Sequence, residues 1–252
     1  MVQQIIVITD GCSNVGLDPV TAAAQAREEN IVVNVIGVVD EGDFGLRGTR
    51  EIEDMAKSGG GLSKIVNSKQ LSQTVQMMTR KTVVHTIQQV VNEELQHIIG
   101  STTSLENLHP DQREKVVDVI EDLEENMSLR VVLLIDASAS MKPKINAVED
   151  AVHDLMLSLQ ARKGRSEVSL FHFPGSKNKN EPAEMDLDWS TEFAIMKRLF
   201  YKINMRGATP TGPALLKVIK YMIDKHSEDE VKMLNETKDV HKKGAMLSDY
   251  IV

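Results

Sequence analysis

Two short, unbroken apolar runs constrain the fold of this chain more than any other sequence feature. They are Ile5-Ile6-Val7-Ile8 and Val131-Val132-Leu133-Leu134-Ile135, and an aspartate, Asp10 or Asp136, follows each run within two residues. A strand without alternation of apolar and polar residues is buried on both faces, which is typical of parallel sheets covered by helices. The two runs therefore predict central strands of a parallel sheet, each leading into a polar loop.

The segments around these runs alternate between strand and helix patterns. Before residue 70 we expect a helix opened by Asp18-Pro19, a strand at Ile31–Val39, a helix at Arg50–Lys57 ended by Gly59-Gly60-Gly61, and a strand at Leu62–Val66. After residue 136 we expect helices at Lys144–Gln160, Glu192–Asn204 and Pro213–Tyr221, a strand at Val168–Phe173, and an edge strand at Ala183–Trp189. This alternation predicts an α/β fold with a doubly wound, mainly parallel sheet.

Between these two parts, the apolar residues recur with a helical period. One apolar face runs from Leu71 to Ile98, and a second runs from Val116 to Met127 and includes Val117. The polar stretch Gly100–Ser104 separates them, so we expect a helical hairpin whose first arm is one long helix or two. Packing against the core of the protein is favoured over a membrane or a partner helix for both faces.

Composition narrows the class of protein. Lys and Arg total 29 against 37 Asp and Glu, and this net charge of -8 argues against a nucleic-acid-binding protein. The single cysteine, Cys12, cannot form an internal disulfide, which fits a reducing compartment. No run is long enough for a signal peptide or a membrane span. These features predict a soluble, cytoplasmic protein without a role at membranes.

Three polar loops carry the candidate chemistry. Asp136-Ala137-Ser138-Ala139-Ser140 and Asp10 each follow a predicted strand, and Thr209 lies in Gly-Ala-Thr-Pro-Thr-Gly before a predicted helix. The carboxyl ends of parallel strands share one edge of the sheet, which is where open α/β sheets bind ligands. Carboxylates and hydroxyls are hard oxygen ligands that suit Mg²⁺ or Mn²⁺.

These residues resemble the metal-ion-dependent adhesion site of von Willebrand factor A domains, in which an Asp-x-Ser-x-Ser motif acts with a distant threonine and a later aspartate. Here the aspartate loop comes first in the chain instead of last. The resemblance therefore implies a circularly permuted domain: residues 1–95 resemble its back half, 96–129 a helical connector, 130–226 its front half, and 227–252 a weakly helical or loose tail. The chain as a whole is similar to small von Willebrand factor A proteins of spore-forming Gram-positive bacteria.

The resemblance implies a function as well. A Mg²⁺ or Mn²⁺ ion held by Asp136, Ser138, Ser140, Thr209 and Asp10 would capture an Asp or Glu side chain of a partner protein, as an adhesion or scaffold module. A signalling or sporulation context would fit. Closure of both halves within one chain is favoured, and a dimer that swaps halves is the alternative.

Two other functions stay open. One is a magnesium-dependent phosphohydrolase using Asp136 or Asp10, although no nucleophile lies beside an obvious base, so we expect no enzyme. The other is a structural helper that binds a partner through the helical hairpin.

Several further residues favour structural roles. Thr211 rivals Thr209 as a ligand but is favoured as the N-cap of the following helix. Cys12 is favoured as a small loop residue over a reactive thiol. Packing or surface roles are favoured for His153, His172 and His226, which lack metal-ligand spacing.

Overall fold

The structure is a computed structural model that describes residues 1–40, 45–99, 109–175, 181–192, 203, 205 and 207–227. Its strands are β1 (Val2–Thr9), β2 (Ile31–Val38), β3 (Gly60–Val66), β4 (Leu129–Asp136), β5 (Ser166–Phe173) and β6 (Glu184–Ser190). They form a six-stranded sheet in the order β3-β2-β1-β4-β5-β6 within the described ranges. Strands β1 to β5 are parallel, and β6 runs antiparallel to β5 at the edge.

This order makes the sheet doubly wound, as the sequence predicts. The chain moves outward from β1 through β2 and β3, returns to place β4 beside β1, and then moves outward on the other side. Strands β1 and β4 of the same chain are hydrogen-bonded neighbours, with Val2 aligned to Leu129 and Ile8 aligned to Ile135. The direction of winding changes between these two central strands, so their carboxyl ends form the topological switch point.

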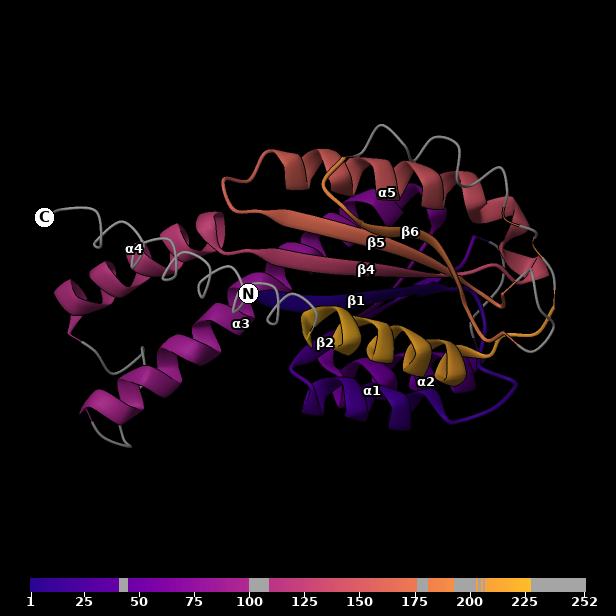
Figure 1. Ribbon diagram of the computed structural model, residues 1–252, viewed down its shortest axis with the longest axis horizontal. Helices are drawn as coiled ribbons and strands as arrows, with labels where there is room; N and C mark the ends of the chain where they lie inside the picture. Colours follow the sequence, from indigo (N-terminus) through magenta and orange to yellow (C-terminus); the bar gives the residue numbers. More distant parts are fainter. Residues whose placement is uncertain are drawn as a thin grey trace, which may run out of the picture.

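Helices cover both faces of the sheet (Figure 1). Helices α1 (Pro19–Glu28) and α2 (Gly45–Ser58) and the helix at 211–227 pack on one face, and α3 (Leu71–Ile99) and α5 (Ile145–Gln160) pack on the other. Consecutive strand residues serve opposite faces: Ile5 and Val7 contact the α1 side, whereas Ile6 and Ile8 contact the α3 side. Unbroken apolar strands are therefore needed to fill two cores.

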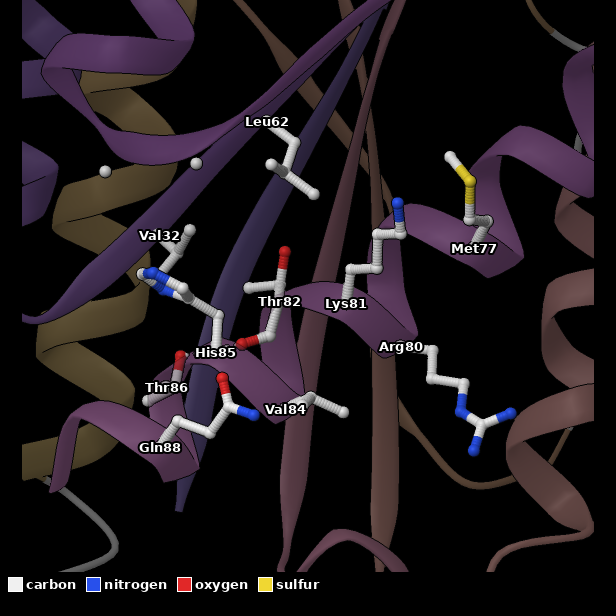
Figure 2. Close-up of a pocket in the computed structure, with 12 residues that line it drawn as sticks. Val32, Leu62, Met77, Arg80, Lys81, Thr82, Val84, His85, Thr86 and Gln88 are labelled. Atoms are coloured by element: carbon white, nitrogen blue, oxygen red, sulfur yellow. Dashed lines mark hydrogen bonds between the residues drawn. The ribbon is translucent and has the colours of Figure 1, made fainter. Parts of the chain in front are cut away.

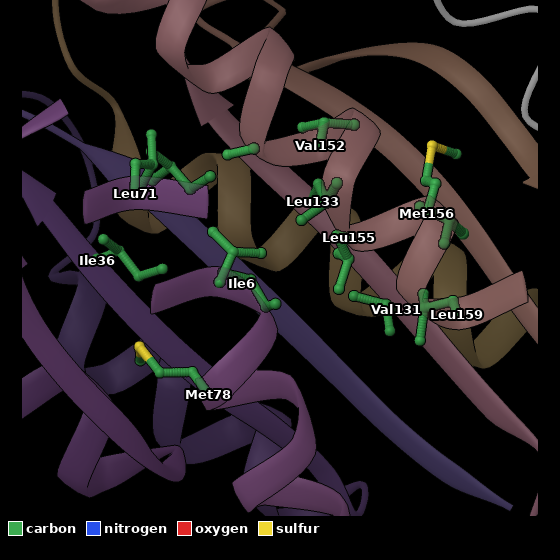
Figure 3. Close-up of a cluster of buried hydrophobic side chains, with 14 of the residues drawn as sticks. Ile6, Ile36, Leu71, Met78, Val131, Leu133, Val152, Leu155, Met156 and Leu159 are labelled. Atoms are coloured by element: carbon green, nitrogen blue, oxygen red, sulfur yellow. The ribbon is translucent and has the colours of Figure 1, made fainter. Parts of the chain in front are cut away.

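The core on the α3 side is built from the helix faces that the sequence identifies. Leu71 and Met78 of α3 and Leu155 of α5 lie over Ile6 and Leu133 of the central strands (Figure 3). All five side chains are buried. The beginning of α3 therefore belongs to the core of the sheet domain, and packing of this face stabilises it.

Helix α3 is one continuous helix, and α4 (Pro110–Asn126) follows it to form the predicted pair. The far ends of both helices extend beyond the sheet (Figure 1). Ile120 is buried against the same core as α3, and Arg80 of α3 forms an ion pair with Glu124 of α4 at 2.7 Å. Val117, which the sequence placed on the inner face, is wrongly assigned, because its side chain is 43% exposed.

The remaining sequence expectations differ from the structure at their edges. Strand β3 begins at Gly60, inside the glycine run expected only to end a helix, and Gly60 has a positive φ of 67° that favours glycine. Helix α2 begins at Gly45, earlier than expected. The predicted helix at Glu192–Asn204, the loop at Gly100–Ser104 and the tail after residue 227 fall almost wholly outside the described residues.

Among the helices that the structure describes, none combines the length and the apolar character that crossing a membrane requires.

Candidate functional site

The loops after β1 and β4 meet at the switch point and share a network of hydrogen bonds. We call its side chains the loop cluster: Thr9, Asp10, Asp136, Ser138, Ser140 and Lys144. Thr9 ends β1, and Asp10 follows it directly. Asp136 ends β4, and the other three residues lie in or next to the short 3-10 helix η3 (Ala139–Lys144). The cluster thus joins residues from two distant segments of the sequence within one chain.

Asp136 lies at the end of β4 and is completely buried. Its Oδ2 accepts a hydrogen bond of 2.7 Å from Thr9 Oγ1, and its Oδ1 accepts one of 2.8 Å from the Ser138 backbone N–H. Burial raises the pKa of Asp136 above its usual value, and these hydrogen bonds oppose that rise only in part. The site therefore holds a carboxylate that lacks full charge compensation.

A chain of hydroxyl groups connects this carboxylate loop to Asp10. Ser138 Oγ lies 3.1 Å from Ser140 Oγ, and Ser140 Oγ donates to Asp10 Oδ1 at 2.8 Å. The other oxygen of Asp10, Oδ2, accepts from Lys144 Nζ at 2.6 Å. Both aspartates predicted as metal ligands therefore lie in one network, and the negative charge of Asp10 also contributes to raising the pKa of Asp136.

Thr209 is held against the loop after β1 through its main chain. Its N–H donates to Asn14 Oδ1 at 2.9 Å, and its carbonyl accepts from the Asn14 N–H at 3.2 Å and from Ser13 Oγ at 3.3 Å. Thr209 is buried, and the adjacent Ala208 is exposed. The third predicted loop thus lies beside the loop that carries Asp10.

Close backbone approaches fix this junction. A Cβ atom on Gly212 would lie 2.0 Å from the Leu17 carbonyl oxygen, and one on Gly16 would lie 2.4 Å from Pro213 Cγ. Gly16 also has a positive φ of 87°. Only glycine fits at these two positions without movement of the backbone.

Thr211 does not cap the helix, contrary to the expectation from sequence. It is the first helical residue, and the Ala214 N–H donates to the Pro210 carbonyl at 3.0 Å. Thr211 Oγ1 is buried and makes no hydrogen bond within the described residues. Burying a hydroxyl without a hydrogen-bond partner costs free energy of folding. Thr211 Oγ1 is therefore an unsatisfied polar group, two residues from the predicted ligand Thr209.

Glu51 of α2 supports the loop after β1 from the side. Its Oε1 accepts a hydrogen bond of 2.6 Å from the Ser13 N–H. Burial raises the pKa of Glu51, and burial together with Glu51 raises the pKa of the Cys12 thiol. A raised pKa disfavours the thiolate, so Cys12 fits the role of a small loop residue better than that of a reactive thiol.

The possible metal ligands of the loop cluster are oxygen atoms, and few of them belong to carboxylates. Within the described ranges, no group of three or more His, Cys, Asp and Glu side chains is arranged to hold a metal ion. Here two carboxylates are combined with the hydroxyls of Ser138 and Ser140, and Ser140 is exposed to solvent. Such a donor set suits a hard cation such as Mg²⁺, which binds through few carboxylates and retains open positions.

Sequence reasoning missed Thr9 and Lys144. In the sequence, Thr9 is only the residue between the apolar run that ends at Ile8 and Asp10. Its contact with Asp136 depends on the pairing of β1 with β4, which places Ile8 beside Ile135. The sequence predicts Lys144 only as the start of a helix, and its contact with Asp10 depends on the path of η3.

His153, His172 and His226 show no shared site. His172 is buried, with Nδ1 2.7 Å from Asp186 Oδ2, and the exposed His153 lies beside Asp154. His226 is exposed on the helix at 211–227. His153 lies on α5 and His226 on a helix that packs on the opposite face of the sheet, so packing or surface roles fit them.

A separate cavity of about 600 Å³ lies between α3 and the edge of the sheet (Figure 2). Leu62, Met77 and Val84 contribute apolar walls, and Lys81 and His85 contribute polar ones. Val32 and Gly60, which also line it, are at the beginning of β2 and β3. The cavity therefore lies at the opposite end of the sheet from the loop cluster.

Comparison with known proteins places the chain in a family. No protein-family model matches it. A crystal structure of an uncharacterized protein from Alicyclobacillus acidocaldarius subsp. acidocaldarius DSM 446 is 43% identical, with a TM-score of 0.83 over 90% of this chain and 96% of that one. The uncharacterized protein YabS of Bacillus subtilis (strain 168) is 44% identical over 212 residues, which is 84% of this chain and 85% of YabS. At this identity and coverage, the chain belongs to the family of YabS.

Proposed function

We propose that this protein is a metal-dependent protein-binding module that captures an acidic side chain of a partner through a divalent cation. The observation that carries the proposal is the loop cluster, in which Asp136, Ser138, Ser140 and Asp10 form one hydrogen-bonded network at the switch point. This is the position where doubly wound sheets bind ligands. The proposed domain is a circularly permuted von Willebrand factor A domain.

The residues present fit a Mg²⁺ or Mn²⁺ ion. Asp136, Ser138, Ser140 and Thr209 would hold it directly, and Asp10 on the β1 side would hold it through Ser140. The bound cation would supply positive charge and an open coordination position for a carboxylate. The buried hydroxyl of Thr211, which has no partner among the described residues, supports the fit, because a bound ion or water is one way to satisfy such a group.

The arrangement favours binding over hydrolysis. Asp136 is buried, and each of its oxygens accepts a hydrogen bond, so it is poorly placed to attack a phosphate. Asp10 has both of its oxygens engaged by Ser140 and Lys144. A phosphohydrolase would turn over an aryl phosphate in the presence of Mg²⁺, and we expect no such turnover.

The rival proposal is a structural helper acting through α3 and α4. Exposed valines favour it: Val90 is 52% exposed, Val117 43% and Val119 54%. Replacing these three valines with serine leaves the loop cluster intact. Capture of a partner should survive this replacement if the metal loops carry the function.

We further propose a cytoplasmic location, since the chain has a single cysteine, which suits a reducing compartment. A signalling or sporulation context follows from the resemblance to proteins of spore-forming bacteria. Nucleic acid is a poor partner for a chain of net charge -8.

Affinity capture from an extract of the source cell tests the proposal. We expect the native chain to retain a protein in Mg²⁺ and to release it in chelator. The Asp136→Ala variant should retain nothing in either buffer. Equal retention by both proteins in both buffers would contradict metal-dependent capture.

A further inference from the structure

Lys144 is the feature of the loop cluster that neither the motif nor the proposed metal site accounts for. Its Nζ lies 2.6 Å from Asp10 Oδ2, and the side chains are 14% and 1% exposed, respectively. Because water screens it less, the Coulomb attraction between these two charges is stronger than in an ion pair on the surface. The structure thus places a fixed positive charge beside one of the two carboxylates proposed to hold a cation.

The ion pair determines which of the two carboxylates keeps an uncompensated negative charge. Asp10 accepts a hydrogen bond from Ser140 Oγ at Oδ1, at 2.8 Å, and pairs with the charged Lys144 Nζ at Oδ2, at 2.6 Å. Asp136 accepts only from neutral groups, the Thr9 hydroxyl and the Ser138 N–H. The charge of Asp10 is therefore compensated within the protein, whereas the charge of Asp136 is not.

Lys144 also faces a second carboxylate. Asp40 follows β2, and the positive charge of Lys144 contributes to lowering the pKa of Asp40, after the larger effect of its hydrogen bonds from Ser68. Lys144 thus has a close partner in Asp10 and a weaker electrostatic attraction to Asp40. Both acids would help to keep its ammonium group in place when a cation approaches.

We propose that Lys144 is a resident counter-ion that holds Asp10 as an indirect partner of the cation, through Ser140, and keeps it from binding the cation directly. This inference rests on the proposed metal site and specifies which protein charges balance the bound cation. With Asp10 compensated by Lys144, a divalent cation is balanced by Asp136 alone. The occupied site then keeps a positive charge, which weakens cation affinity and favours an anionic partner group such as a carboxylate.

Calorimetric titration of the full chain with MgCl₂, repeated with MnCl₂, tests this role. Lys144→Met keeps the length of the side chain and removes its charge, and we expect the cation to bind at least about tenfold more tightly. Lys144→Arg keeps the charge and should bind within about threefold of the native protein. Lys142→Met is the matched control, because Lys142 is an exposed lysine of the same 3-10 helix.

A double variant tests whether Asp10, once its ion pair with Lys144 is removed, is the group that binds the cation more tightly. In Lys144→Met, the gain should come from Asp10 becoming a direct ligand, so Asp10→Asn added to Lys144→Met should remove most of the gain. Urea unfolding of each variant shows whether it is folded before titration. A tighter affinity that persists in the double variant would overturn the assignment to Asp10.

The outcomes separate this inference from the proposed function. Cation binding by the native chain with equal affinity in Lys144→Met overturns the role of Lys144 and leaves the metal site standing. Binding by Lys144→Met but not by the native chain supports the counter-ion and overturns metal-dependent capture by the native protein. Binding by neither protein overturns both.

Discussion

The loop cluster and the α3–α4 hairpin handle buried groups in opposite ways. In the loop cluster, Asp136 and Asp10 are withdrawn from water and held by hydroxyls, one backbone N–H and one lysine. In the hairpin, burial is apolar near the sheet, as at Ile87, and gives way to exposed side chains such as Val90. Stability and ligand binding should therefore separate: hairpin substitutions should change the first, and loop-cluster substitutions mainly the second.

The largest expected effect on stability lies in the hairpin. Ile87→Ala removes a side chain that is 1% exposed. It should lower the free energy of unfolding by about 2–5 kcal/mol, since the cavity adds to the loss of apolar burial. Urea unfolding measures this change. Val90→Ala on the same helix should stay within about 0.5 kcal/mol of the native protein. An equal effect of both substitutions would break the distinction between buried and exposed faces of α3.

Thr9→Val should have the next largest effect. It removes the donor to Asp136 Oδ2 without changing the shape of the side chain. The free energy of unfolding should fall by about 1–3 kcal/mol, because a buried carboxylate oxygen loses its hydrogen bond. Thr86→Val is the control, since Thr86 Oγ1 donates only to a carbonyl of its own helix. A loss no larger than that of the control would show that the Thr9 contact is not important for the carboxylate.

Part of the fold and part of the loop cluster could be predicted from the sequence. The apolar runs sufficed to predict β1 and β4, because a strand buried on both faces has an unmistakable composition. The sequence motif brought together Asp136, Ser138 and Ser140, which are local to one loop. Thr9 and Lys144 were missed, since their contacts depend on which strands are neighbours and on the path of η3.

The errors have physical causes as well. Val117 was assigned to the inner face because apolar residues are normally buried, but a helix that extends past the sheet has less core to cover. Thr211 was assigned as a cap because threonine favours that position, whereas the helix begins one residue earlier than a cap at Thr211 would allow. Such choices between adjacent positions depend on tertiary packing.

The pH dependence of stability should report on Asp136. Its raised pKa means that the folded protein binds a proton which the unfolded chain has already released, in the range just above the usual carboxyl pKa of about 4. Without metal, this group therefore stabilises the fold at low pH, and its contribution declines as the pH rises through that range. Asp136→Asn should flatten this part of the curve of unfolding free energy against pH. A parallel curve for the variant would contradict the raised pKa.

The smallest effect is expected at the surface of the hairpin. Arg80 Nε lies 2.7 Å from Glu124 Oε1, but the Arg80 side chain is 78% exposed. Arg80→Ala should change the free energy of unfolding by no more than about 1 kcal/mol, because water and salt screen such pairs. Urea unfolding at low and high salt measures it. A loss as large as that of Ile87→Ala would mean that α4 depends on this ion pair for its position.

The most direct test of the account is thermal unfolding of the native chain, Asp136→Ala and Asp10→Ala as MgCl₂ is increased. A ligand that binds only the folded state at about 100 times its Kd adds about 2.7 kcal/mol of stability, so the native Tm should rise by several degrees. Both variants should lose this rise: the first lacks the uncompensated carboxylate, and the second leaves Lys144 to repel the cation. An unchanged native Tm at millimolar Mg²⁺, or a full rise in Asp10→Ala, would contradict a single site built from two distant segments of the chain.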